Sequence, residues 1–431
     1  MVEYTPLDGN IGFMFIKRAL KQEIIETLDF APVVLINGAR QSGKSTFAKE
    51  LIAEGKVKEY ITMDNPTTLS QITKSPVDFL ENLPIGTVID EVQRIPELFT
   101  SIKYVVDNNR VAGRFLLTGS ANILLLPKLA DSLAGRMSLH TLRPFSVGEF
   151  ENKKEDFIDW LFSENFEGFK IKERLDAKDL YNRITKGSYP EVLASNYSPE
   201  NQTRWYDSYI NTLLVRDIRD MSDISGLNDI PALLSLLASR NGSLLNTSDI
   251  SRTIDIPSTT LKRYINLLHS LYLIDFLKPW YKNFGKTLIK APKTYLNDTG
   301  FCLHLLQKNQ ESLEVDRILF GHLLENFIIL EIQKQIGWSK VKPSMYYLRT
   351  KDGQEIDLIL ESRSGKLVAI EIKASSSFKP ESVSNIKEFE KSMGDNFHRG
   401  IIFYTGQETF KISDKIYVLP IQALWEGRLE I

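Results

Sequence analysis

Hydrophobic and polar residues alternate in patterns that predict strands and helices along the first third of the chain. Three short apolar runs lie at residues 33–36, 87–89 and 114–120, and each ends in polar or glycine residues. Runs of this length, bounded by turn residues and separated by helical patterns, are typical of buried strands. Residues 1–150 therefore read as an alternating α/β unit.

Helical periodicity dominates the middle of the chain. Residues 151–180 are rich in charge and read as a solvated connection, and apolar side chains at three- and four-residue steps then predict packed helices around residues 205–214. Further on, the cap residues 246–248 predict a short helix at residues 249–253, and Pro257 precedes a second helix. A strand pair is expected at residues 273–277 and 287–289. This order is typical of a winged helix-turn-helix.

The last part of the chain returns to mixed structure. The segment DRILFGHLLENFIILEIQKQIG predicts an amphipathic helix, and two strands follow around the turn at Ser364-Gly365. We therefore expect an α/β protein with four units: an α/β unit at 1–150, a helical connector at 151–230, a winged helix at 231–315 and an α/β unit at 316–431.

The first apolar run leads into a phosphate-loop motif. Gly38-x-x-x-x-Gly43-Lys44-Ser45 follows a predicted strand and opens a predicted helix, which is the context this motif requires. Glycines let successive backbone N–H groups point at phosphates, and the helix N-terminus adds its positive dipole end. Lys44 should reach the β- and γ-phosphates, and the Ser45 hydroxyl should hold Mg²⁺. The predicted ATP-binding residues are Gly38, Ala39, Arg40, Gln41, Ser42, Gly43, Lys44, Ser45 and Thr46.

An acidic pair and a polar strand end supply the other candidates for ATP chemistry. Asp90 and Glu91 follow the second apolar run. We read Asp90 as a holder of magnesium and Glu91 as the base that polarises the attacking water. An acidic pair in such a place can also be a helix cap. If the third strand lies between the other two, Thr118 or Ser120 comes beside the γ-phosphate.

Four segments carry a resemblance to the AAA+ ATPases, in the subgroup in which an ATPase module precedes a conserved C-terminal domain. They span most of residues 30–150 and read GARQSGKST, VIDEVQRIPELF, LLTGSANILLL and LAGRMSLHTLRPFSVGEF. The resemblance implies a doubly wound core, Thr118 or Ser120 as sensor, and assembly into a ring or dimer. It also implies that Arg136 acts at the γ-phosphate, in cis or from a neighbouring subunit. The alternative for Arg136 is a surface salt bridge.

The second helix of the predicted winged unit carries candidate nucleic-acid contacts. Its apolar residues Leu261, Ile265 and Leu268 define a buried side, so Ser258, Thr259, Lys262 and Arg263 should face outward. Such a helix reads a DNA groove in some proteins and only packs against protein in others. The fold alone does not decide between the two.

Acidic residues are unusually placed in the last unit. Glu325 lies among apolar helix residues, Asp357 lies on one strand of the hairpin, and Glu371 and Lys373 share one face of the next. This order resembles the PD-(D/E)xK nuclease superfamily over roughly residues 316–431, although Ile356 stands where the motif has proline. The resemblance implies that Glu325, Asp357 and Glu371 hold Mg²⁺ and that Lys373 orients the attacking water. The alternatives are a nuclease-like fold that only binds, and charges that simply face solvent.

Composition narrows the class of protein. The 431 residues are 42% hydrophobic and 25% charged, as in a soluble globular protein, and the net charge of −2 excludes a generally basic coat protein for nucleic acid. Cys302 is the only cysteine, so neither an intrachain disulfide nor a cysteine metal cluster can form. Without a signal sequence or an apolar run of membrane-spanning length, we expect a cytoplasmic protein with no membrane partner.

Three functions remain open from the sequence. The first is an Mg²⁺-dependent ATPase that acts on duplex or branched DNA as a homo-oligomer. The second is a nucleotide-controlled switch or scaffold that recognises a protein partner and has an inactive nuclease-like domain. The third is a toxin-type or defence nuclease that uses ATP only for gating. Phosphate contact needs basic side chains, so the first is favoured by the Lys and Arg residues at 186, 204, 262, 263, 282, 286, 290 and 293.

Overall fold

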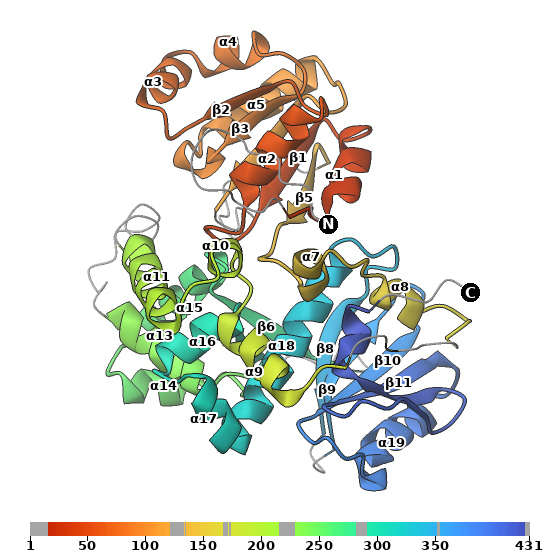
Figure 1. Cartoon of the computed structure of the whole chain (residues 1–431). Helices are drawn as coiled ribbons and strands as arrows, with labels where there is room; N and C mark the ends of the chain where they lie inside the picture. Colours follow the sequence, from red (N-terminus) through yellow and green to blue (C-terminus); the bar gives the residue numbers. More distant parts are fainter. Residues whose placement is uncertain are drawn as a thin grey trace.

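The structure is a computed structural model that describes residues 16–120, 133, 135–166, 171, 174–214, 229–281, 291–350 and 354–426. Figure 1 shows an N-terminal module set apart from a larger remainder of helices and sheet. The chain passes from one to the other after β5 (Met137–Thr141), and α7 (Val147–Glu151) lies at the junction.

A parallel sheet forms the centre of the N-terminal module. Its described strands lie in the order β2-β3-β4-β1-β5, and every neighbouring pair is parallel. Besides β5 they are β1 (Val33–Asn37), β2 (Glu59–Thr62), β3 (Thr87–Asp90) and β4 (Phe115–Gly119). Since β4 lies between β1 and β3, the polar ends of these three strands meet at one edge of the sheet.

Helices cover both faces of this sheet. Helices α1 (Lys21–Leu28) and α2 (Lys44–Ala53) bury Val34 and Ile36 on one face. On the other, α3 (Pro66–Lys74), α4 (Pro76–Glu81), the short η1 (Val92–Arg94) and α5 (Leu98–Asn108) bury Val33 and Leu35. Alternate residues of β1 thus serve different cores, as strand geometry requires. The α/β architecture expected for a phosphate-loop ATPase is confirmed.

Helices make up most of the middle of the chain, as predicted, but residues 157–161, expected within a solvated connection, form a helix that is buried in the core. They are α7, α8 (Phe157–Leu161), α9 (Ala177–Lys186), α10 (Pro190–Ala194), α11 (Pro199–Thr212), α13 (Asp229–Ser239), α14 (Thr247–Thr253), α15 (Ser258–Ser270), α16 (Thr299–Leu305) and α17 (Gln310–Val315). Asn246 caps α14 by accepting a hydrogen bond from the Asp249 N–H, as the cap residues predicted.

The strand that follows α15 pairs with two other strands. Strand β6 (Ile274–Pro279) is antiparallel to β7 (Lys293–Leu296) and, at its far end, parallel to β8 (Ser344–Arg349). The predicted partner strand at residues 287–289 lies outside the described residues, as do Lys282, Lys286 and Lys290. Strand β6, in the segment predicted as a winged helix, therefore joins the C-terminal sheet through β8.

That sheet is mixed, with the order β12-β13-β11-β10-β9-β8-β6-β7. Strands β9 (Glu355–Glu361) and β10 (Leu367–Lys373) form the predicted hairpin, with Ile370 opposite Leu358. Gly365, at φ 81°, makes the turn. The remaining elements are α18 (Arg317–Ile336), η5 (Pro380–Val383), α19 (Ser384–Met393), η6 (Gly394–Asn396), β11 (Phe397–Tyr404), β12 (Phe410–Lys411), β13 (Ile416–Pro420) and η7 (Ile421–Leu424).

One hydrophobic core joins the helical middle of the chain to one face of the C-terminal sheet, and a separate core lies between the other face and α19. The first core contains buried residues from α8 (Trp160), α11 (Tyr209), α15 (Leu268), α18 (Ile328) and the C-terminal sheet (Phe403). The domain boundaries at 230 and 315 stay predictions, and side chains from both sides of each boundary pack together in this core.

Candidate functional site

The phosphate loop lies between β1 and α2 and has the backbone that the motif predicts. Gly38 and Gly43 have φ angles of 151° and 94°, which strain any other residue. A Cβ atom on Gly38 would lie 2.2 Å from the Leu142 carbonyl oxygen, so a side chain has no room there. The first N–H groups of α2 have no acceptor within the helix and are directed at the space that the loop encloses.

Lys44 is held across this loop. Its Nζ donates to the carbonyl oxygens of Gly38 (2.9 Å) and Ala39 (2.8 Å), and the residue is 5% exposed. These bonds place a buried positive charge inside the curl of backbone. A triphosphate in the loop would therefore meet one ammonium group and several N–H donors.

Asp90 is the centre of the predicted magnesium site. Ser45 Oγ lies 3.2 and 3.1 Å from its two carboxylate oxygens, and the Thr118 hydroxyl also donates to it. Hard oxygen ligands of this kind are what Mg²⁺ prefers. Ser45 and Asp90 therefore fit the ion, which would supply charge neutralisation at the phosphates.

Tyr60 is a neighbour of Asp90 that the sequence did not reveal. It ends up beside the site because β2 pairs with β3, and its hydroxyl donates to Asp90 Oδ2. Burial and the Asp90 carboxylate raise the pKa of Tyr60 well above its usual value, so the hydroxyl keeps its proton. In the sequence, Tyr60 is only a tyrosine in a short strand, and such tyrosines are too common to indicate a functional site.

Glu91, the predicted base, is oriented by its own local network. It adopts a left-handed backbone with φ 57°, and its Oε2 accepts from Gln93 Nε2. The same Nε2 lies 2.9 Å from Ser120 Oγ. The Glu91 N–H lies 3.4 Å from Thr118 Oγ1, which links it to the Asp90 group. Gln93 is a second residue that the sequence did not single out.

Arg136 lies at the edge of the sheet opposite to its own phosphate loop. Its carbonyl accepts from the Val33 N–H at the start of β1, whereas the loop follows Asn37 at the end of that strand. Five strand residues separate the two edges by roughly 16 Å. The guanidinium pairs with Asp107 of α5, at 3.1 Å between Nη2 and Oδ2. The salt bridge is the alternative named for this residue, and its action at the γ-phosphate, in cis or from a neighbouring subunit, stays a prediction.

The acidic residues of the C-terminal half do come together. Asp357 Oδ2 accepts from the Ile372 N–H at 2.8 Å, and Lys373 Nζ lies 2.8 Å from Glu371 Oε2. Burial and the Glu325 charge raise the pKa of Asp357 to about 6. Burial and the Asp357 charge raise the pKa of Glu371 to about 7. Glu371 Oε1 is buried without a hydrogen-bond partner.

Two residues of β7 enter this acidic cluster unforeseen. Lys293 Nζ lies 3.0 Å from Glu325 Oε1, and Tyr295 donates to the same oxygen at 2.6 Å. Lys293 also lies 3.2 Å from Glu355. Across the described ranges, no three His, Cys, Asp or Glu side chains adopt an arrangement that could hold a metal ion. The predicted ligands Glu325, Asp357 and Glu371 thus lie near one another, with Glu325 and Glu371 paired with lysines and Asp357 bonded to a backbone N–H.

Helix α15 presents the predicted contact residues to solvent. Thr259, Lys262 and Arg263 are exposed, whereas Leu261 and Leu268 are 0% exposed. Ser258 is also exposed at the start of the helix.

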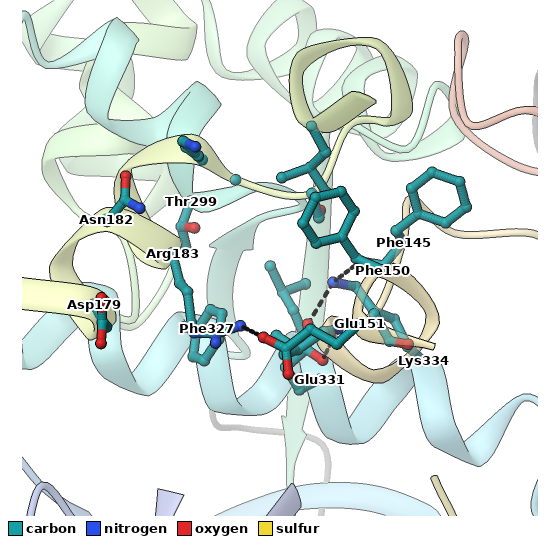
Figure 2. Close-up of a pocket in the computed structure, with 17 residues that line it drawn as sticks. Phe145, Phe150, Glu151, Asp179, Asn182, Arg183, Thr299, Phe327, Glu331 and Lys334 are labelled. Atoms are coloured by element: carbon teal, nitrogen blue, oxygen red, sulfur yellow. Dashed lines mark hydrogen bonds and ion pairs between the residues drawn. The ribbon is translucent and has the colours of Figure 1, made fainter. Parts of the chain in front are cut away.

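Where α7, α9 and α18 meet, close to the N-terminal module, charged side chains surround a cavity of about 190 Å³. Figure 2 shows Arg183 of α9 directed at Glu151, and Lys334 between the Phe145 carbonyl and Glu331. Glu331 also accepts from the Val147 N–H at 2.9 Å. The first turn of α7 is therefore fixed to α18.

Family comparisons match three parts of the chain. Residues 31–151 match the family described as AAA domain, and residues 177–312 and 320–424 match two domains of unknown function, DUF8612 and DUF4143. None of the described helices has both the length and the apolar character of a membrane span.

Three curated relatives align over most of their length, and all are uncharacterized proteins. Rv2008c of Mycobacterium tuberculosis is 29% identical, over 99% of this chain and 89% of its own. MJ1544 of Methanocaldococcus jannaschii is 22% identical, over 92% and 88% respectively. A protein of Haemophilus influenzae is 26% identical, over 78% and 82%.

Solved structures show a remote likeness. The Walker-type ATPase PABY2304 of Pyrococcus abyssi is 16% identical with a TM-score of 0.38, over 66% of this chain and 94% of its own. AMPPCP-bound DnaA of Aquifex aeolicus is 14% identical with a TM-score of 0.28, over 58% and 86%. The assignment therefore rests on the family matches and on the loop geometry: residues 31–151 are an AAA-type P-loop ATPase domain, and residues 320–424 are a DUF4143 domain.

Proposed function

We propose that this protein is an Mg²⁺-dependent ATPase that acts on DNA and contacts it through helix α15. The observation that carries the proposal is the exposed row Thr259, Lys262 and Arg263, on a helix whose opposite side is buried. Basic and hydroxyl side chains on the second helix of a helix-turn-helix are suited to phosphate and base-edge contacts. The near-neutral total charge restricts such contacts to a local surface.

ATP hydrolysis is assigned to groups at one edge of the N-terminal sheet. The loop N–H groups and Lys44 would bind the phosphates, while Ser45 and Asp90 would hold Mg²⁺. Glu91 would orient the attacking water, and Thr118 would keep the Asp90 carboxylate in place. Gln93 donates to Oε2 of Glu91, which leaves Oε1 as the oxygen that would accept a hydrogen bond from the attacking water.

The first experiment measures the ATPase rate with no DNA and with single-stranded, duplex and branched DNA. We expect DNA to stimulate hydrolysis, and Lys44→Ala to abolish it. The double variant Lys262→Ala/Arg263→Ala should lose the stimulation but keep the basal rate. The control Lys387→Ala/Lys391→Ala removes two exposed charges from α19 and should behave as wild type.

DNA affinity as a function of salt provides the second readout. Binding through phosphates should weaken steeply as salt rises, and removing two basic side chains should reduce the slope of log affinity against log salt by about 2. If none of the three DNAs binds or stimulates the wild-type protein, the DNA proposal is wrong. The nucleotide-controlled switch or scaffold that recognises a protein partner then becomes the better description.

A second candidate function is metal-dependent phosphodiester cleavage in the C-terminal half. Its support is the unpartnered Oε1 of buried Glu371, next to a second carboxylate with a raised pKa. A divalent cation would relieve both. Cleavage of DNA in Mg²⁺ or Mn²⁺ that is lost in Asp357→Ala would establish it. No cleavage by the wild-type protein would leave a nuclease-like domain that only binds.

A further inference from the structure

Arg18 is a buried arginine just before α1 that no motif singles out. It is 7% exposed, and its guanidinium lies over the Phe145 ring at 4.6 Å. Its Nη1 donates to the carbonyl oxygen of Ser42, a residue of the phosphate loop, at 2.8 Å. Its Nε pairs with Glu149 Oε1 at 3.1 Å, and its Nη2 donates to the Arg143 carbonyl. All three nitrogens therefore have acceptors.

The bond to Ser42 bears on the direction of the next N–H group. A peptide unit is planar and trans, so its C=O and N–H point in opposite directions. When Arg18 holds the Ser42 carbonyl outside the loop, the N–H of Gly43 must point the other way, toward the interior. Gly43 adopts φ 94°, which glycine reaches without strain, so the bond from Arg18 selects this conformation among the several open to glycine.

The ion pair with Glu149 fixes the guanidinium itself. Glu149 is the third residue of α7 and forms a capping box with Ser146, so its carboxylate has little freedom. The same Oε1 accepts from the Ala19 N–H at 2.8 Å. A planar guanidinium that donates to several acceptors in a buried site has a fixed orientation, and the single ammonium group of lysine cannot make the same set of bonds.

We propose that Arg18 is a positioning residue for ATP, which turns the Gly43 N–H toward the phosphates by holding the Ser42 carbonyl, with Glu149 as its anchor. Arg18 reaches the loop carbonyl from behind, so its contribution to ATP runs through the loop backbone. The role concerns nucleotide binding and does not depend on DNA.

The orientation of the Gly43 N–H should affect KM more than kcat. This N–H binds the phosphates in the ground state and in the transition state alike, so losing it raises KM more than it lowers kcat. A residue that only stabilised the fold would lower the melting temperature and leave KM unchanged in the protein that remains folded.

The test compares Arg18→Lys, Arg18→Gln and Glu149→Gln with wild type in the full chain. Binding of the fluorescent analogue mant-ATP gives Kd, and steady-state hydrolysis gives KM and kcat. We expect both Arg18 variants to raise Kd and KM about ten-fold with kcat within about three-fold, and Glu149→Gln to lie between them and wild type. Lys44→Ala is the control for lost binding, and Arg363→Gln, exposed in the β9–β10 hairpin, is the control for losing an arginine.

Each outcome of this test either supports or overturns the role of Arg18 in ATP binding. Kd and KM within about two-fold of wild type in both Arg18 variants, with unchanged melting, would overturn the role of Arg18. If Arg18→Gln does not fold, Arg18→Lys and Glu149→Gln decide by the same values. Wild-type protein that binds no mant-ATP would refute ATP binding itself, whereas a failure of DNA binding leaves this inference untouched.

Discussion

Lys293 of β7 and Glu325 of α18 form an ion pair in the C-terminal half, with 3.0 Å between Nζ and Oε1. Burial alone would lower the pKa of Lys293, but the charges of Glu325 and Asp357 raise it above its usual value. The lysine supplies positive charge among carboxylates that were predicted to hold a metal. A divalent cation would therefore have to compete with an ammonium group that is already in place.

Replacing Lys293 by methionine should destabilise the protein. The change leaves Glu325 and Glu355 close together with no cation between them, and breaking a buried pair in this way costs about 3 kcal/mol. Urea denaturation followed by tryptophan fluorescence measures the loss. Lys391→Met, on the exposed side of α19, should change stability by less than about 0.5 kcal/mol. Equal stability of Lys293→Met and wild type would show that the pair contributes nothing.

Tyr60→Phe should weaken the use of Mg²⁺ by the ATPase. The tyrosine donates to the Asp90 carboxylate, and outer-shell donors of this kind typically change metal affinity about ten-fold. The Mg²⁺ concentration for half-maximal hydrolysis, at saturating ATP, should rise by that factor. Tyr104→Phe, at an exposed position of α5, should leave it unchanged. An unaltered Mg²⁺ dependence in Tyr60→Phe would separate Tyr60 from the metal site.

Arg136 can be tested by mixing two inactive variants. If it acts on a neighbouring subunit, Arg136→Ala and Lys44→Ala are each inactive, but a mixed assembly contains sites with an intact loop from one subunit and an intact arginine from the next. With random assembly of equal amounts, roughly a quarter of the sites are complete. Hydrolysis should therefore return on mixing. Full activity of Arg136→Ala alone would leave only the Asp107 salt bridge for this residue.

Asp275→Asn should lower the stability of the protein at neutral pH. Burial by itself would raise the pKa of Asp275, but the hydrogen bond with His269 and the charge of Arg143 lower it well below its usual value. A depressed pKa in the folded state stabilises the protein above the usual aspartate pKa of about 4. That contribution is lost as pH falls further.

Melting temperatures between pH 3 and pH 7 check this sign. The wild type should melt a few degrees above Asp275→Asn at pH 7, and the gap should shrink toward pH 3. Asp395→Asn, at an exposed position, should follow the wild type throughout. A gap that widens on acidification would contradict the role of the Asp275 charge.

The phosphate-loop core was predictable because its signals are local. Gly38, Gly43 and Lys44 have fixed spacing, and their backbone conformations are properties of a few consecutive residues. The place of Asp90 followed from the rule that parallel strands end at one edge. Strand order was not local, so the position of Thr118 between β1 and β3 had to come from the structure.

Most of the missed residues act across long sequence separations, and Gln93, which bonds Glu91 two residues away, is the exception. Arg18 reaches a carbonyl 24 residues away and a carboxylate 131 residues away. Lys293 was named from the sequence only among basic residues suited to phosphate contact, whereas it is buried and paired with carboxylates because α18 and β9 pack against β7. Burial and partners decide the role of such a side chain, and neither is encoded in its immediate neighbours.

The shared core behind the N-terminal module has a practical consequence for anyone who dissects the protein. A fragment cut at residue 230 or 315 would leave Trp160, Tyr209 or Leu268 without their packing partners, and exposed apolar surface of this kind promotes aggregation. A fragment that starts ahead of Phe145 keeps α7 and every buried residue of this core except Ala39 of the phosphate loop. The same cut would part Arg18 from Phe145 and Glu149, so mixing the two pieces would show whether the phosphate loop depends on those contacts.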